Sequence, residues 1–140
     1  MMADSEPWIT LQRSSEEALG LFRDPGREAY VAVTHGQPCG FVLIMMQGAF
    51  AGYVQSLGVA PDFRGRGIGS RLMGFAETRI FRESPNVFVC VSSFNMDARR
   101  LYERLGYAVI GELTDYIVEG HAEILLRKSL GSLRNFQPLP

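Results

Sequence analysis

The sequence Gly52–Ala76, GYVQSLGVAPDFRGRGIGSRLMGFA, contains three structural signals in succession. Aromatic and β-branched residues at 53–59 predict a strand, which Pro61 brings to an end. A glycine-rich turn, RGRGIGS, follows at 64–70, and apolar residues then recur at helical spacing from Ile68 onward. Glycines before a helix let the backbone approach an anion, and the first-turn amides point toward it. The stretch therefore predicts an anion-binding site, and the expected anion is a phosphate.

A glycine also lies inside the predicted strand, in the triplet Leu57, Gly58 and Val59. Such a glycine indicates a β-bulge or a close backbone approach. A bulge would leave backbone N–H and C=O groups unpaired, and these could bind an amide-rich ligand and polarise a carbonyl group. We therefore expect Leu57, Gly58 and Val59 to contribute backbone groups to the ligand site. A bulge that only separates two strands is the alternative.

Two common phosphate-binding motifs do not fit the glycine-rich turn. A Walker loop needs Gly-Lys-Ser/Thr after its glycines, and the turn contains no lysine. The dinucleotide fingerprint needs a third glycine where this sequence has Ser70. It also needs an acidic residue near the end of the next strand, and residues 87–93 contain none. Both classes of nucleotide site are therefore disfavoured.

The turn instead resembles the pyrophosphate motif of the GNAT superfamily of acetyl-CoA-dependent N-acetyltransferases. The family motif Gln/Arg-x-x-Gly-x-Gly/Ala is matched by Arg64, Gly67 and Gly69, and residues 57–65 fit its Leu-Gly-Val-x-Pro-x-x-Arg-Gly pattern. The resemblance implies that acetyl-CoA is the acetyl donor and that backbone amides of the turn hold its pyrophosphate. The implied binding residues are Arg64, Gly65, Arg66, Gly67, Ile68, Gly69 and Ser70.

A second motif, NMDARRLYERLGY at residues 95–107, predicts an amphipathic helix. Asn95 suits the N-cap position, and Gly106 suits the position that ends the helix. Taken alone, Tyr102 reads as a half-buried residue of such a helix. The pattern Asn-x-x-Ala-x-x-Leu-Tyr-x-x-x-Gly-Tyr also resembles the second GNAT motif. That resemblance implies that Tyr102 lies near the thioester sulfur as a general acid, and Asn95 could also bond the cofactor arm.

The resemblance spans about residues 28–128 and implies an α/β (α+β) fold. Its sheet would be central, mixed, mostly antiparallel and twisted, with six to seven strands flanked by three to four helices. We expect a single domain, 1–128, followed by a C-terminal tail, 129–140. GNAT domains usually have two helices where this chain has only residues 13–27, so the N-terminal helical region is shortened. Other expected elements are a first strand at 8–12, a helix begun by a capping box at 14–17, a hairpin turn at 35–38, and paired strands at 107–113 and 122–128.

Composition narrows the classes of function. The 140 residues are 46% hydrophobic with a net charge of −1, which argues against disorder and against a broad nucleic-acid surface. Cys39 and Cys90 lack metal-ligand spacing, so no metal site is expected. The N-terminus lacks the pattern of a signal peptide, and the longest apolar run, Gly40–Met46, is too short to span a membrane. We therefore expect a cytoplasmic protein with no membrane contact.

The main interpretation is an enzyme that moves the acetyl group of acetyl-CoA to a primary amine of a small molecule or peptide. Many GNAT relatives carry a glutamate on the central strand where this chain has Gln55, so the general base is open. Asp115, Glu119, His121 and Glu123 are candidates. His121 is the predicted base because imidazole titrates in the useful range. A water chain, or deprotonation before binding, would be alternatives.

Because Gln55 replaces the glutamate of many relatives, a second interpretation is a non-catalytic CoA-binding or regulatory GNAT-like domain. The acceptor is not legible from the sequence. Acidic residues between 112 and 123 would suit a cationic acceptor such as a polyamine, an aminoglycoside or a peptide amine, or they form a solvated edge. Many GNAT domains pair through their C-terminal strands, so a homodimer also stays open.

Overall fold

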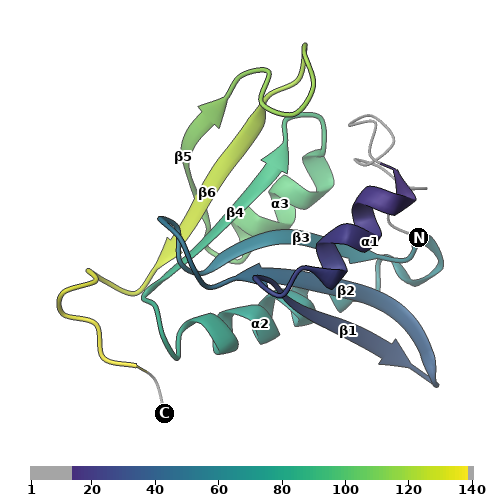
Figure 1. The fold of residues 1–140 in the computed structure, drawn as a ribbon, viewed down its shortest axis with the longest axis horizontal. Helices are drawn as coiled ribbons and strands as arrows, with labels where there is room; N and C mark the ends of the chain where they lie inside the picture. The colour runs from purple at the N-terminus through teal and green to yellow at the C-terminus, as the bar shows by residue number, and fades with distance from the viewer. Residues whose placement is uncertain (1–13, 139–140) are drawn as a thin grey trace.

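The computed structural model describes residues 14–138 (Figure 1). In chain order the elements are α1 (Ser15–Arg23), β1 (Glu28–Thr34), β2 (Gln37–Met45), β3 (Tyr53–Val59), a short 3-10 helix (Pro61–Phe63), α2 (Ile68–Ile80), β4 (Asn86–Ser92), α3 (Met96–Arg104), β5 (Ala108–Leu113) and β6 (Glu123–Ser129). The predicted first strand, residues 8–12, lies outside the described residues. The last strand includes Ser129, one residue beyond the expected start of the tail.

The six strands form one mixed sheet in the order β1-β2-β3-β4-β6-β5. Neighbouring strands are antiparallel except β3 and β4, which run parallel. This central pair is short, because only Tyr53 and Val54 of β3 pair with β4, and the two strands then diverge (Figure 1). The fold expected from the sequence is confirmed, with six strands and three α-helices in the described residues.

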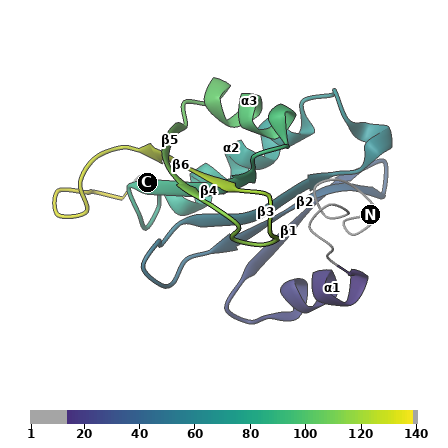
Figure 2. The same cartoon turned by 90° about the horizontal axis from the view of Figure 1, so that it is seen from above.

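Helices cover both faces of the sheet: α2 and α3 lie on one face and α1 on the other (Figure 2). The larger core packs α2 against the buried side chains of the central strands, which are Val42, Ile44, Val54, Val87, Val89 and Leu126. A smaller cluster of Ala18, Phe41 and Leu43 holds α1 on the opposite face. In β4, Val87, Val89 and Val91 are buried in the larger core, whereas Phe88 and Cys90 on the opposite face are half-buried. The expectation that both faces of this strand are covered is therefore met on one face only.

Helix α1 begins with the capping box predicted from the sequence. The Oγ of Ser14 accepts a hydrogen bond from the amide of Glu17 at 3.1 Å, and the Glu17 carboxylate accepts one from the amide of Ser14 at 2.9 Å. The helix is nine residues long and ends at Asp24, whose backbone is extended. The segment before β1 therefore contains one helix in its described part.

The β-bulge predicted at Leu57–Val59 lies instead at Gln55. Strand β3 pairs regularly with β2 over residues 56–59, and Gln55 is then skipped in the register. Gly58 is needed for a different reason, because the ring of Phe41 on β2 occupies the space that a β-carbon at Gly58 would need. The predicted position is wrong because a glycine in a strand indicates close approach as readily as irregular pairing.

We expect Gly58→Ala to destabilise the fold. The added methyl group would displace Phe41, which holds α1 through an edge-to-face contact with Phe22 (5.1 Å between ring centroids). Overpacking of this kind costs about 1–3 kcal/mol of unfolding free energy, which urea denaturation would measure. Gly74→Ala is the matched control, because Gly74 is exposed on α2 with no atom within 4 Å of an added β-carbon. Equal unfolding free energies for the two variants would contradict this account of Gly58.

Candidate active site

The glycine-rich turn connects the end of β3 to the start of α2. Gly65 and Gly67 have φ angles of 76° and 79°, in the left-handed region that favours glycine. Gly67 is the N-cap of α2 and has no side chain that could accept a hydrogen bond from the first-turn amides. The amides of Ile68, Gly69 and Ser70 therefore lack an intrahelical acceptor, and the helix dipole adds positive potential at the same point. This geometry fits a diphosphate group.

The two arginines of the turn make different contacts. Arg64 donates a hydrogen bond from Nε to the carbonyl oxygen of Val59 at 3.1 Å, which ties the turn to the end of β3. Arg66 lies over the ring of Phe63, with 5.3 Å between its guanidinium carbon and the ring centroid. Both arginine residues are exposed, so both guanidinium groups are accessible to an anionic ligand.

A cavity of about 490 Å³ lies where β3 and β4 diverge. Because the pairing with β4 ends at Val54, alternate N–H and C=O groups of residues 55–59 on that edge have no strand partner. The cavity is lined by residues 53–57 of β3, residues 90–92 of β4, and side chains from α3, β6 and the β5–β6 loop. Unpaired backbone groups therefore lie at the wall of the cavity.

Helix α3 connects the glycine-rich turn with the cavity. Its N-cap, Asn95, accepts a hydrogen bond from the amide of Ala98 through Oδ1 at 3.3 Å, and both residues line the cavity. Leu101 lies against the start of α2, 3.3 Å from the position that a β-carbon would take at Gly69. The turn and the cavity are thus neighbouring parts of one site, and Asn95 serves both the helix and the cavity wall.

Tyr102 lines the cavity from α3 and is 5% exposed. Its ring packs edge-to-face against Tyr107, with 5.9 Å between the centroids. Burial raises the pKa of the Tyr102 phenol above its ordinary value of about 10. The hydroxyl therefore stays protonated at neutral pH and can donate a hydrogen bond or a proton.

Three neighbouring strands contribute a second group of residues, Tyr53, Cys90 and Glu123, to the same cavity. Residues 87, 89 and 91 of β4 are buried in the core under α2, so Cys90 faces the side of the sheet that carries α1. Burial raises the pKa of the Cys90 thiol, and the carboxylate of Glu123 raises it further, while a hydrogen bond from Tyr53 opposes them. Cys90 is therefore a thiol rather than a thiolate at neutral pH.

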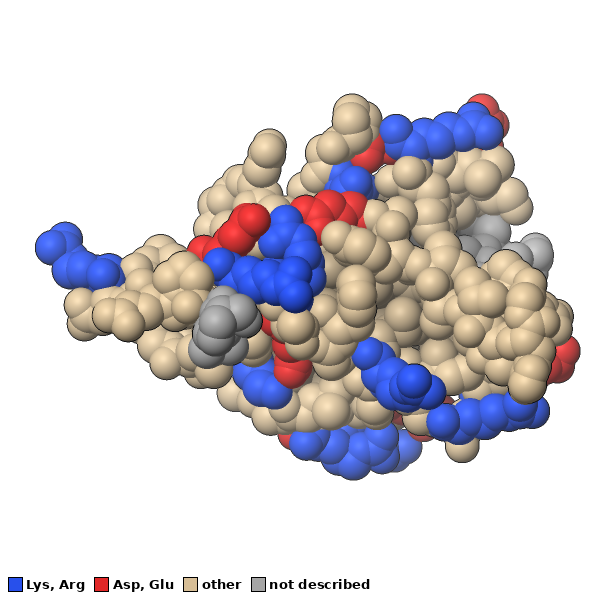
Figure 3. All heavy atoms as spheres, turned by 90° about the horizontal axis from the view of Figure 1, so that it is seen from below, with Lys and Arg blue, Asp and Glu red and all other residues tan. Residues whose placement is uncertain are grey.

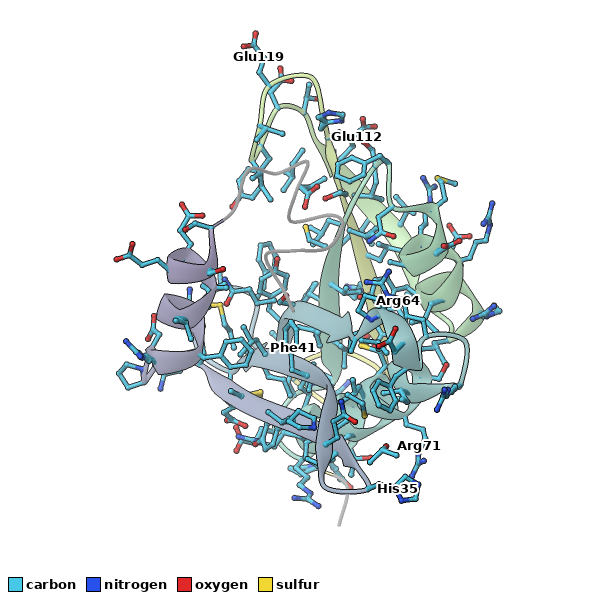
Figure 4. All side chains as sticks on the ribbon, turned by 90° about the vertical axis from the view of Figure 1, so that its right-hand side faces the viewer. His35, Phe41, Arg64, Arg71, Glu112 and Glu119 are labelled. Atoms are coloured by element: carbon cyan, nitrogen blue, oxygen red, sulfur yellow. The ribbon has the colours of Figure 1, made fainter. Side chains whose placement is uncertain are left out.

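Of the four acid–base candidates from the sequence, Glu123 alone lines the cavity. The ring of His121 packs edge-to-face on Phe94, with 5.0 Å between the centroids. The carboxylate of Asp115 accepts a hydrogen bond from a loop amide at 2.7 Å. Figure 4 shows Glu119 at the tip of the β5–β6 loop, pointing away from the molecule. A catalytic role for His121 stays a prediction that this arrangement does not favour.

The sequence interpretation did not include Tyr53, Cys90 or Tyr116 among the site residues, although all three line the cavity. The regular alternation of valines at 87, 89 and 91 could have shown that Cys90 points away from α2. No comparable signal exists for Tyr116, because its position depends on the path of the β5–β6 loop.

Three observations bear on other classes of partner. On the face seen in Figure 3, lysine and arginine side chains are interspersed with acidic ones and do not form one basic patch. Within residues 14–138, no helix has the length and apolar character needed to cross a bilayer. The same residues contain no group of three or more His, Cys, Asp or Glu placed to hold a metal ion.

Comparison with known proteins agrees with this geometry. A family model described as "Acetyltransferase (GNAT) family" matches residues 2–107. A nourseothricin acetyltransferase is 28% identical, with a TM-score of 0.67 over 77% of this chain and 68% of that chain. The ribosomal-protein-S18-alanine N-acetyltransferase from Escherichia coli is 14% identical, with a TM-score of 0.72 over 95% of both chains. A Bacillus anthracis str. Ames protein, solved in complex with acetyl coenzyme A, is 20% identical, with a TM-score of 0.65 over 80% and 67%.

Because the family model covers more than half of its length, the chain belongs to the GNAT family of acetyltransferases. It is an acyltransferase of the acetyl-CoA-dependent N-acetyltransferase class, and acetyl-CoA is its acetyl donor. The family resemblance stated from the two sequence motifs is confirmed.

Proposed function

We propose that the protein transfers the acetyl group of acetyl-CoA directly to a primary amine of a small molecule or peptide, with Tyr102 as the general acid. The observation that carries this proposal is the cavity, which Tyr102 and the unpaired edge of β3 both line beside the start of α2. Residues 64–70 would hold the pyrophosphate. Leu57–Val59 and Asn95 would bind the amide-rich arm that leads from the pyrophosphate to the thioester.

Acetyl transfer requires the amine lone pair to attack the carbonyl carbon of the thioester while the carbon–sulfur bond breaks. Negative charge gathers first on the carbonyl oxygen, where a backbone amide from the unpaired edge of β3 can donate a hydrogen bond worth about 3 kcal/mol. The charge then moves to sulfur, where Tyr102 donates its proton to the departing thiolate. The amine nitrogen loses one proton, and the products are an amide and the thiol of CoA.

Glu123 is the carboxylate best placed to accept the proton that the amine loses. It lines the same cavity as Tyr102, whereas Gln55 has no basic group. The amide oxygen of Gln55 accepts a hydrogen bond from Nε of Arg27, which fixes that side chain at the cavity wall. The role of the glutamate found on the central strand of many relatives would thus fall to a residue of β6.

Direct attack is favoured over an acetyl-enzyme intermediate. Cys90 is the thiol lining the cavity, and its raised pKa leaves too little thiolate for an efficient nucleophile. The hydroxyls of Ser56 and Ser92 also line the cavity, but no histidine among the described lining residues could activate them. One transfer step from donor to acceptor is the simplest reaction that these groups support.

The proposal is tested by incubating the purified protein with acetyl-CoA and a set of primary amines. We expect release of free CoA thiol only when an amine is present, and mass spectrometry should find one added acetyl group on that amine. Thermal unfolding with CoA alone provides an independent measure of donor binding. Stabilisation by CoA without thiol release for any amine would favour the non-catalytic CoA-binding domain, and thiol release without an amine would indicate a hydrolase.

A further inference from the structure

The charges that line the cavity restrict the acceptor. Glu123 carries the one carboxyl group among the described residues of the lining, and none of them is lysine, arginine or histidine. Glu123 is 6% exposed, so its carboxylate can form a charge-assisted hydrogen bond with a desolvated ammonium group. A second ammonium group in the same cavity would lose its hydration without gaining an ionic partner among the lining residues of 14–138, which is costly.

A cation lies behind the wall formed by β3. Arg27 donates from Nε to the amide oxygen of Gln55 and pairs through Nη1 with Asp24, and its side chain is 19% exposed. Gln55 lines the cavity from β3 and Glu123 lines it from β6, on either side of β4. A positive charge near Glu123 is therefore favoured, whereas the amide oxygen of Gln55 already accepts a hydrogen bond from Arg27 and carries no negative charge for a second ammonium group.

Two exposed residues of the cavity lining are aromatic. Phe50 is 52% exposed and Tyr116 is 66% exposed, and both contribute to the lining together with Tyr53. The ring of Phe50 is positioned by Phe88, with 4.9 Å between the centroids. Exposed aromatic side chains in the same lining as the buried carboxylate of Glu123 suit a ligand with an apolar body and a charged end.

We infer that the acceptor is a primary amine with one positive charge on an apolar body, bound with its ammonium group at Glu123. Glu123 takes the proton that frees the nitrogen lone pair for attack and passes it to solvent, and the proton lost after attack restores the phenol of Tyr102. This inference rests on the proposed acetyl transfer and narrows its acceptor class. Polyamines and aminoglycosides, which an acidic final hairpin would favour, are not favoured by the cavity. Asp115 and Glu119 do not line it.

Three primary amines test the inference, and their rates are compared after correction for the fraction of neutral amine at the assay pH. Phenethylamine has one charge and an aromatic body, ethylamine has one charge and almost no body, and spermidine has several charges. We expect kcat/KM for phenethylamine to exceed that for spermidine by about 100-fold, because the extra charges of spermidine lose hydration unpaired. It should exceed that for ethylamine by about 10-fold, because the aromatic body buries apolar surface against the exposed aromatic residues of the lining.

A matched pair of variants tests the role of Glu123. Glu123→Gln keeps the side-chain shape and removes the charge, and should lower kcat/KM for phenethylamine by about 100-fold. Glu119→Gln makes the same change in the β5–β6 loop, four residues before Glu123 and outside the cavity lining, and should leave kcat/KM within about twofold of wild type. The thermal shift with CoA should be unchanged in both variants, which shows that each is folded and binds the donor.

The outcomes separate the inference from the proposed function. Faster acetylation of spermidine than of phenethylamine would overturn the inference and leave N-acetylation intact. Equal rates for Glu123→Gln and Glu119→Gln with phenethylamine would also overturn it. Failure of CoA to stabilise the wild type, together with no thiol release for any of the three amines, would instead overturn the proposed function.

Discussion

Gly67→Val should remove most of the stabilisation that CoA gives the wild-type protein. At a CoA concentration of one hundred times the dissociation constant, the wild type should gain about 2.7 kcal/mol of unfolding free energy. A valine side chain at the N-cap of α2 would stand where the pyrophosphate must meet the amides of Ile68, Gly69 and Ser70. The measurement is the shift in thermal unfolding with increasing CoA for both proteins.

The control for Gly67→Val must separate backbone strain from blocked binding. Gly67 has a φ angle of 79°, which a β-branched residue adopts only at a cost. Gly36, in the β1–β2 turn, has a φ angle of 75°, and neither glycine has an atom within 4 Å of an added β-carbon. Gly36→Val should lower the unfolding temperature without CoA to a similar extent and keep the full CoA shift. An undiminished CoA shift in Gly67→Val would mean that the donor binds elsewhere.

Tyr102→Phe should reduce turnover by about 10- to 1000-fold while leaving the dissociation constant of acetyl-CoA nearly unchanged. The hydroxyl interacts most strongly when negative charge reaches sulfur, so its loss should appear in kcat rather than in donor binding. Tyr107→Phe is the matched control, because Tyr107 is also buried and packs on Tyr102 but does not line the cavity. Similar kcat values for the two variants would make Tyr102 a packing residue.

The same proposal predicts a pH profile. Burial raises the pKa of Tyr102, so the phenol keeps its proton up to at least about pH 10. The wild-type rate should therefore show no falling limb from Tyr102 below that value. A falling limb near pH 8 that disappears in Tyr102→Phe would contradict the raised pKa.

Local signals were enough to predict the helices and the glycine-rich turn on which the proposed donor site is built. The capping box at Ser14, the glycine-rich turn before Ile68 and the N-cap at Asn95 each act within a few residues. The sequence therefore located the three α-helices of residues 14–138 and the two motifs that resemble those of the family. Such signals can be read from sequence because a helix cap depends on the conformation and side chains of only a few neighbouring residues.

The acceptor side depends on register, which local signals do not determine. The irregularity at Gln55 arises from how β3 pairs with β2, and nothing in the sequence around Gln55 marks it. His121 and Glu123 are two residues apart, and in a continuous strand they would share a face. Because β6 begins at Glu123, that residue enters the cavity wall while His121 turns onto Phe94 in the preceding loop. The choice of His121 as base rested on its titration range, which carries no information about position.

The division of the sheet into two faces has an evolutionary consequence. The groups proposed to hold acetyl-CoA lie on α2, α3 and the unpaired edge of β3. Helix α1 and the β5–β6 loop also line the cavity, but they carry none of those groups. Substitutions in those two segments can accumulate without altering the first-turn amides of α2 or the hydroxyl of Tyr102. Selection on the acceptor and selection on the donor can thus act on separate parts of the chain. Related proteins of this architecture bear names as different as a nourseothricin acetyltransferase and a ribosomal-protein alanine N-acetyltransferase. Of the residues inferred above to contact the acceptor, Tyr116 lies in the β5–β6 loop, so a change of acceptor should be recorded there first.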